Sequence, residues 1–82
     1  MYQTISETIS VAGAYIPGGF KPIKFRWKNR LYPIKEICSQ HDFKDGNVKK
    51  RRFSVLSGNT VYLLEFNRDQ ESWQLVEIWL EE

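Results

Sequence analysis

Short runs of alternating apolar and polar residues, separated by tight turn signals, dominate this chain of 82 residues. In the clearest run, residues 23–28, every second residue is apolar and the residues between them are cationic. Successive side chains of a β-strand point to opposite faces, so the pattern predicts a half-buried strand with Ile23, Phe25 and Trp27 on its inner face. We expect a tight hairpin turn at Asn29, because Asn tolerates the left-handed backbone conformation that such turns require.

The same alternation predicts further strands along the chain. The final segment combines a possible Ser cap with apolar residues at helical spacing, but Trp, Val and Ile favour extended chain, so we prefer a strand there. The expected elements are an amino-terminal strand at 4–15, a Pro-Gly-Gly loop at 17–19, a return strand at 31–38 with a bulge near 35–36, a polar loop at 39–48, strands at 50–56 and 61–66 joined by a turn at 57–60, and a last strand at 73–80.

Five to six short strands without a helix favour an all-β fold. We expect a small antiparallel meander that curls into an SH3-like barrel or a rolled sheet, because curling covers the single apolar face and protects the edges. The whole chain, residues 1–82, is expected to be one domain, with a strand and loop over 1–19 and the meander core over 20–80. The predicted core comprises Phe25, Trp27, Tyr32, Ile34, Phe53, Val55, Tyr62, Leu64, Trp73 and Leu75.

Cys38 is the single cysteine of the chain, which excludes an internal disulfide and a zinc site with several cysteines. A single cysteine that forms no internal disulfide fits a protein of the reducing cytoplasm. The polar start predicts no secretion signal, and no apolar run approaches the roughly 18 residues that suggest a membrane span. We interpret Cys38 as a small core residue and His41 as a loop residue, and we expect no catalytic residue, metal or cofactor.

Positive charge is concentrated in one part of the chain. Eleven of the twelve Lys and Arg residues lie between Lys21 and Arg52, where only three acidic residues occur. The rest of the chain is acidic, so the formal net charge of +2 hides a strong asymmetry. Such asymmetry indicates either an anionic partner or internal pairing between the two parts.

The cations form two stretches, at residues 24–30 and at residues 49–52. If their strands are neighbours in the sheet, the two stretches form a candidate nucleic-acid surface. Their outward side chains would then contact phosphates without strong sequence preference, and Trp27, Tyr32 or Phe43 would add base stacking. The alternatives are a solvated exterior, cross-strand pairing with acids such as Glu65 and Glu77, and an acidic protein partner. The predicted nucleic-acid-binding residues are Lys24, Arg26, Lys28, Arg30, Lys49, Lys50, Arg51 and Arg52.

The last segment carries apolar residues on both of its strand faces. A strand of this kind is either covered on both sides or forms an interface. We therefore predict a protein-interaction or homodimerisation surface at Ile78, Trp79 and Leu80. The alternative is that the amino-terminal strand covers the second face.

Several motifs together resemble a known family. They are the Phe-x-Trp-x-x-Arg-x-Tyr hairpin at 25–32, the Arg-rich strand that begins at Arg51, Tyr-x-Leu at 62–64 and Trp-x-Leu at 73–75. Over residues 20–79 the chain resembles small uncharacterised bacterial domains of the DUF6504 type, although Asn29 stands where a Gly is usual. The shared residues are aromatic and turn residues, so the resemblance implies a fold more than a chemistry. Some members of that family accompany Y-family DNA polymerases, which favours DNA as a partner without assigning a role to any residue.

No set of residues in the sequence specifies a reaction, so we expect a non-enzymatic protein. The leading hypothesis is a nucleic-acid-binding accessory module, for either DNA or RNA. The alternative is a protein-interaction module that uses the carboxy-terminal strand.

Overall fold

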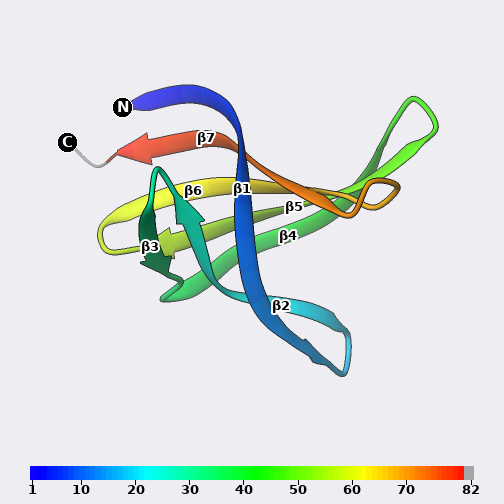
Figure 1. Cartoon of the computed structure of the whole chain (residues 1–82), viewed down its shortest axis with the longest axis horizontal. Coiled ribbons are helices and arrows are strands. Elements are labelled where there is room, and N and C mark those ends of the chain that lie inside the picture. The colour runs from blue at the N-terminus through cyan, green and yellow to red at the C-terminus, as the bar shows by residue number, and fades with distance from the viewer. Residues whose placement is uncertain (81–82) are drawn as a thin grey trace.

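Seven antiparallel strands form one sheet in the computed structural model, which describes residues 1–80 (Figure 1). Their order across the sheet is β3-β2-β1-β7-β6-β5-β4. The all-β prediction is confirmed, but the expected five to six strands are too few, because the return strand expected at 31–38 is divided between β3 and β4. The strands are β1 (Tyr2–Ile16), β2 (Gly19–Trp27), β3 (Arg30–Pro33), β4 (Glu36–Asp45), β5 (Val48–Ser57), β6 (Thr60–Asn67) and β7 (Ser72–Leu80).

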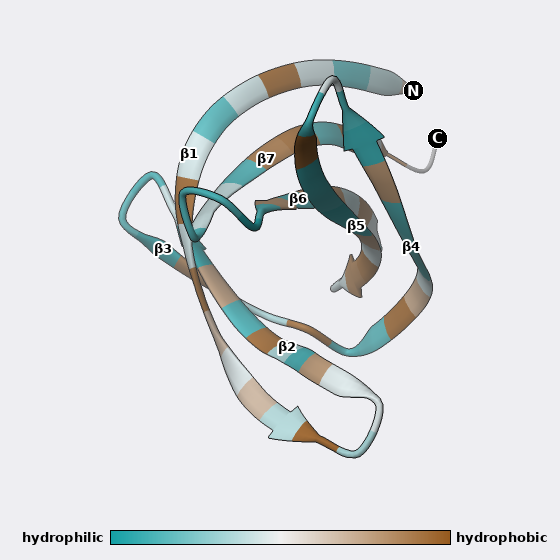
Figure 2. Ribbon diagram, turned by 90° about the vertical axis from the view of Figure 1, so that its right-hand side faces the viewer, coloured by the Kyte–Doolittle hydropathy of each residue, from teal (hydrophilic) through white to brown (hydrophobic). Residues whose placement is uncertain are grey.

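The two edge strands of the sheet, β3 and β4, are consecutive in the chain and are separated only by Ile34 and Lys35. Three Cα–Cα steps span at most about 11 Å, so the sheet must roll until its edges approach each other (Figure 2). At this junction the Ile34 N–H donates to the Ile23 carbonyl on β2 at 2.8 Å, and the Lys35 N–H donates to the Leu56 carbonyl on β5 at 2.7 Å. The sheet does not close into a barrel, so the SH3-like alternative is wrong. The predicted bulge near 35–36 is instead the point where the chain passes from one edge to the other.

Residues 39–48 belong to the β4–β5 hairpin and do not form the expected loop. β4 extends to Asp45, which is the partner of Val48 on β5, and Gly46 occupies a left-handed turn position with a φ of 64°. Polar residues mislead here because β4 is an edge strand that is largely exposed. Such a strand gains its stability from backbone pairing and from side-chain contacts with β5, and does not need an apolar face.

Both hairpin turns that the sequence indicates are present. Lys28 and Asn29 have φ values of 51° and 60°, as a two-residue primed turn requires, and Gly58 has a φ of 60° in the turn between β5 and β6. The amino-terminal strand and the preference for a strand over a helix in the last segment are also confirmed.

The core lies inside the roll. Six of the ten predicted core residues are buried, and the other four, Trp27, Tyr32, Ile34 and Trp73, are half-buried and pack against them. Ile9 on β1 and Ile78 on β7 are buried as well, although neither is among the predicted core residues. Within residues 1–80 the buried hydrophobic core consists of Ile9, Phe25, Phe53, Val55, Tyr62, Leu64, Leu75 and Ile78.

A bulge at Val76 explains why β7 has apolar residues at both sets of alternating positions. Leu64 on β6 pairs with Leu75, but Leu63 pairs with Glu77, so Val76 is an extra residue on β7. One extra residue switches which alternate positions face inward. Leu75 before the bulge and Ile78 after it therefore both reach the core.

A second bulge places Ile23 outside the core. Ala12 on β1 pairs with Lys24, but Gly13 pairs with Pro22, so Ile23 is left without a partner and is half-exposed. The expectation that Ile23 shares the inner face with Phe25 is therefore wrong, and Pro22 is buried in its place.

Candidate nucleic-acid interface

The sheet order separates the two cationic stretches. Residues 24–30 lie on the β2–β3 hairpin, whereas residues 49–52 lie on β5, and three strands stand between β2 and β5. The β2–β3 and β4–β5 turns also lie at opposite ends of the molecule (Figure 1). The condition of neighbouring strands is therefore not met. The reason is that β1 pairs with both β2 and β7, which inserts the amino-terminal strand between the two halves of the chain.

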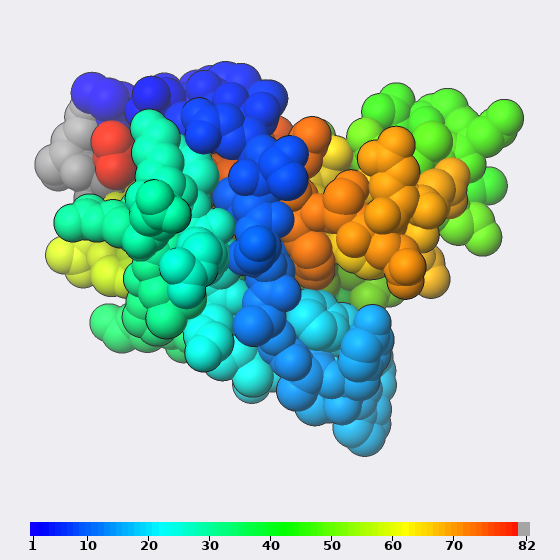
Figure 3. Space-filling view, in the orientation of Figure 1, coloured from blue at the N-terminus to red at the C-terminus, as the bar shows by residue number. Residues whose placement is uncertain are grey.

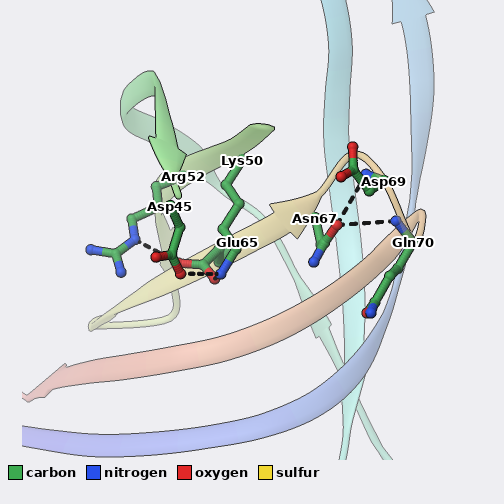
Figure 4. A network of polar contacts seen from close by, with 7 residues as sticks. All are labelled: Asp45, Lys50, Arg52, Glu65, Asn67, Asp69 and Gln70. Carbon is green, nitrogen blue, oxygen red and sulfur yellow. Dashed lines mark hydrogen bonds and ion pairs between the residues drawn. The ribbon is translucent and has the colours of Figure 1, made fainter. Parts of the chain in front are cut away.

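Two β5 cations on the outer face share a buried carboxylate. Glu65 on β6 is 7% exposed, and its Oε1 accepts a hydrogen bond from Arg52 Nε at 2.9 Å. Lys50 Nζ lies 3.2 Å from Glu65 Oε2 and 3.0 Å from Asp45 Oδ2 (Figure 4). Its hydrogen bonds to Asp45 and Glu65 raise the pKa of Lys50. Carboxylates within the fold therefore compensate the positive charges of Lys50 and Arg52, as expected if basic and acidic parts of the chain pair with each other.

Arg51 points to the inner side of β5, since side chains alternate between the faces of a strand. Its partner across the ladder is Asp42, and Arg51 Nη2 donates to Asp42 Oδ2 at 3.0 Å while Nε donates to Oδ1. The hydrogen bond from Arg51 lowers the pKa of Asp42, and the same bond raises the pKa of the guanidinium. Of the four β5 cations, Lys49 is exposed and makes no ion pair with residues 1–80.

The four cations of the β2–β3 hairpin are exposed, and none forms an ion pair within the part of the chain that the structure describes. Lys24 and Arg26 share the outer face. Lys28 occupies the turn, with Nζ 4.8 Å from the centroid of the Trp27 ring. Arg30 is the cross-strand partner of Trp27 and therefore lies on the other side of the hairpin. We call these four residues the hairpin cations.

Small side chains flank the hairpin cations on the neighbouring strand. Lys24 pairs with Ala12 on β1, and Arg26 pairs with Ser10. Together with Leu31 of β3, these residues line a shallow depression of about 230 Å³. A chain-like ligand can therefore reach Lys24 and Arg26 without displacing a bulky side chain.

A pocket lined by aromatic residues, which the sequence analysis did not identify, lies at the opposite end of the molecule. It has a volume of about 150 Å³. Its residues come from five strands and from the β6–β7 turn, so no local pattern in the sequence indicates it. The residues that line this aromatic pocket are Tyr15, Phe20, Arg51, Phe53, Phe66, Arg68 and Trp73.

The predicted interface on β7 is divided between the two faces of the strand. Ile78 is 6% exposed and belongs to the core, so it is not part of an accessible surface, whereas Trp79 on the outer face is 50% exposed. Leu80 is in phase with Ile78 at the end of the strand and is 39% exposed. β1 lies beside β7 in the sheet and does not cover the outer face. A row of apolar side chains crosses four strands there, since Leu56 pairs with Val61, Val61 with Trp79, and Trp79 with Tyr2.

Cys38 and His41 lie on the edge strand β4. Cys38 is exposed, so the expectation of a core residue is wrong. The register shifts between Ile37 and Ser39, which leaves Cys38 as the extra residue. His41 lies within the strand and not in a loop. Within residues 1–80 no group of three or more His, Cys, Asp or Glu side chains is placed to hold a metal ion.

Comparisons with protein-family models, with curated proteins and with solved structures found no match to the chain. The resemblance to the DUF6504 type therefore stays a prediction. No helix within residues 1–80 has the length and apolar character needed to cross a membrane.

Proposed function

We propose that this protein is a non-enzymatic nucleic-acid-binding module that contacts phosphates through the hairpin cations, without strong sequence preference. The observation that carries the proposal is the contrast between the two cationic stretches. Lys50, Arg51 and Arg52 are held by Asp or Glu residues, whereas the hairpin cations have no carboxylate partner within residues 1–80. Cations left exposed and unpaired in a hairpin are available to neutralise phosphates.

The arrangement of the hairpin cations predicts the size of the contact. Lys24 and Arg26 are two residues apart on β2, or about 7 Å along the strand, and Lys28 follows in the turn. With Arg30 on the reverse side, three to four phosphates are neutralised. The logarithm of the affinity should therefore fall with the logarithm of salt concentration with a slope of about −3 to −4 for duplex DNA, or about −2 to −3 for a single strand.

Fluorescence anisotropy with labelled duplex DNA, single-stranded DNA and RNA, at 50 mM and 200 mM salt, tests the proposal. Arg26→Ala should weaken binding and reduce the salt slope by about one unit. Lys49→Ala is the matched control, because it removes one exposed positive charge beside the β4–β5 turn, which lies at the other end of the molecule (Figure 1). Absence of binding at 50 mM salt, or an equal effect of both substitutions, would contradict the proposal.

Self-association through the outer face of β7 is the second candidate. The observation that favours it is the apolar row that includes Tyr2 and Trp79, whose ring centroids lie 4.8 Å apart while both residues remain about half-exposed. An exposed apolar row across several strands is a site at which a second copy of the chain can pack. Sedimentation velocity should detect a dimer that Trp79→Glu dissociates, and a wild-type protein that stays monomeric would count against this candidate.

A further inference from the structure

We infer that the aromatic pocket binds a single nucleotide, with the base against the aromatic side chains and the phosphate at Arg68. The pocket lies between the β1–β2 hairpin and the β6–β7 turn, on the side of the molecule where the β4–β5 hairpin also projects (Figure 3). The hairpin cations lie toward the other end of β2 and in the β2–β3 turn, and none of them lines the pocket. This inference therefore goes beyond the proposed function and rests on different residues.

Aromatic side chains form most of the lining of the pocket. Trp73 is at its centre, with ring centroids 4.9 Å from Phe66, 5.5 Å from Phe53 and 5.9 Å from Phe20. Tyr15 extends the row, with its ring 5.1 Å from Phe20, although Tyr15 is 85% exposed. Stacking of a nucleic-acid base on an aromatic side chain contributes about 1 to 3 kcal/mol. The tilted rings thus leave an accessible π-surface where a planar group gains contact.

The volume of the pocket limits the ligand. Sites for drug-sized molecules usually measure about 300 to 1,000 Å³, and this pocket is smaller, at about 150 Å³. It therefore accommodates one planar ring system and not a dinucleotide or a larger cofactor.

The β1–β2 hairpin is held in place beside the pocket by two close approaches. A Cβ at Gly13 would lie 2.7 Å from the Phe20 ring, so the ring packs directly over the backbone of β1. A Cβ at Gly19 would lie 3.2 Å from Arg51 Nη1, so the start of β2 closely approaches the guanidinium. Because Asp42 fixes Arg51 through two hydrogen bonds, both walls of the pocket are positioned before a ligand binds.

The charge of the lining selects an anionic ligand. It contains two guanidinium groups and no carboxylate. Asp42 balances Arg51, but Arg68 is exposed and makes no ion pair within the described residues. The Arg68 backbone N–H donates to the Lys49 carbonyl at 2.9 Å, which fixes the turn that carries the side chain. Arg68 would repel a quaternary ammonium, and a neutral aromatic compound would make no ion pair with Arg68. A nucleotide, by contrast, can stack its base on the rings and pair its phosphate with the guanidinium.

NMR titration of the Trp73 indole N–H and of the Arg68 amide tests the inference, with adenosine 5′-monophosphate, adenosine and inorganic phosphate as separate probes. We expect the monophosphate to shift both signals with a dissociation constant in the range of about 1 mM. Adenosine should bind more weakly, and phosphate alone should leave Trp73 unmoved. A single-stranded tetranucleotide distinguishes the source of the ligand: shifts with the tetranucleotide but not with the mononucleotide assign the pocket to one unit of a strand.

Two substitutions of exposed residues complete the test without disturbing the core. Arg68→Ala should weaken binding of the monophosphate roughly fivefold or more, because it removes a charge-assisted contact, and Tyr15→Ala should weaken binding of both monophosphate and nucleoside. Arg26→Ala, which weakens the contact of the proposed function, should leave this titration unchanged. Absence of shifts with all nucleotide probes, or binding that neither Arg68→Ala nor Tyr15→Ala weakens, would overturn the inference and leave the proposal for the hairpin cations standing.

Discussion

The bulge at Val76 decides which of two adjacent residues stabilises the core, and truncation of each residue tests this directly. Ile78 is 6% exposed, whereas its neighbour Trp79 is 50% exposed. In a regular strand without the bulge, Trp79 would share the inner face with Leu75 and Ile78 would point outward. The two substitutions Ile78→Ala and Trp79→Ala therefore report on the register of β7.

The expected loss of unfolding free energy in each variant follows from how deeply the truncated side chain is buried. Ile78→Ala removes three buried carbon atoms, or about 2.4 kcal/mol at roughly 0.8 kcal/mol for each. Incomplete collapse of the cavity brings the expected loss of unfolding free energy to about 3 kcal/mol. Trp79→Ala loses mainly the contact with the Tyr2 ring, so we expect about 1 kcal/mol. A domain of this length has a total free energy of unfolding of roughly 4 to 12 kcal/mol. The loss expected for Ile78→Ala is therefore a large fraction of the total.

Urea denaturation followed by far-UV circular dichroism measures both losses without relying on tryptophan fluorescence, which Trp79→Ala alters. Ile78→Val, with an expected cost of about 1 kcal/mol, provides a milder variant that remains folded. If Trp79→Ala costs as much as Ile78→Ala, or more, then β7 lacks the bulge and the reasoning from its register is wrong.

Three further predictions concern other parts of the fold. Gly13→Ala should lower the melting temperature, at a cost of about 1 to 3 kcal/mol, because its Cβ would lie 2.1 Å from the Lys21 carbonyl oxygen; an unchanged melting temperature would contradict the close packing of β1 on β2. The hydrogen bond from Arg51 lowers the pKa of Asp42 from 3.8, so this pair stabilises the fold above about pH 3.8 and its contribution is lost as the pH falls through the folded-state value. Acid denaturation of Asp42→Asn should therefore show a smaller loss of stability than the wild type below this pH. Burial raises the pKa of Tyr62 from 10.0, so its contribution is lost as the pH rises above 10, and Tyr62→Phe should reduce the alkaline loss measured by circular dichroism.

Local features of the fold were predictable because they depend on neighbouring residues. Alternation around Phe25 and Phe53 indicates strands whose inner residues are buried, and Asn29 and Gly58 indicate turns that need a positive φ. The predictions failed at bulges, where one extra residue changes the phase, as at Val76. They also failed on the edge strand β4, whose polar residues resemble a loop.

The candidate site was predictable only in part. The concentration of cations is a property of the sequence, and the exposed hairpin cations, such as Arg26, were identified from it. The pairing of Arg52 with Glu65 was only one of several alternatives, because it depends on which strands are neighbours. The aromatic pocket around Trp73 had no signal in the sequence, since its walls are far apart along the chain.

The sequence by itself determined that this chain forms antiparallel strands, where most of its tight turns lie, and that its positive charge is concentrated between Lys21 and Arg52. Period-two alternation and left-handed turn residues act over a few neighbouring positions, so they can be recognised without knowing the rest of the fold. Only the tertiary structure decided that β1 lies between β2 and β7, which divides the cations into an exposed group and a paired group. Strand order depends on how distant segments share one core and on how the roll brings the edges β3 and β4 together, and those contacts leave no local pattern.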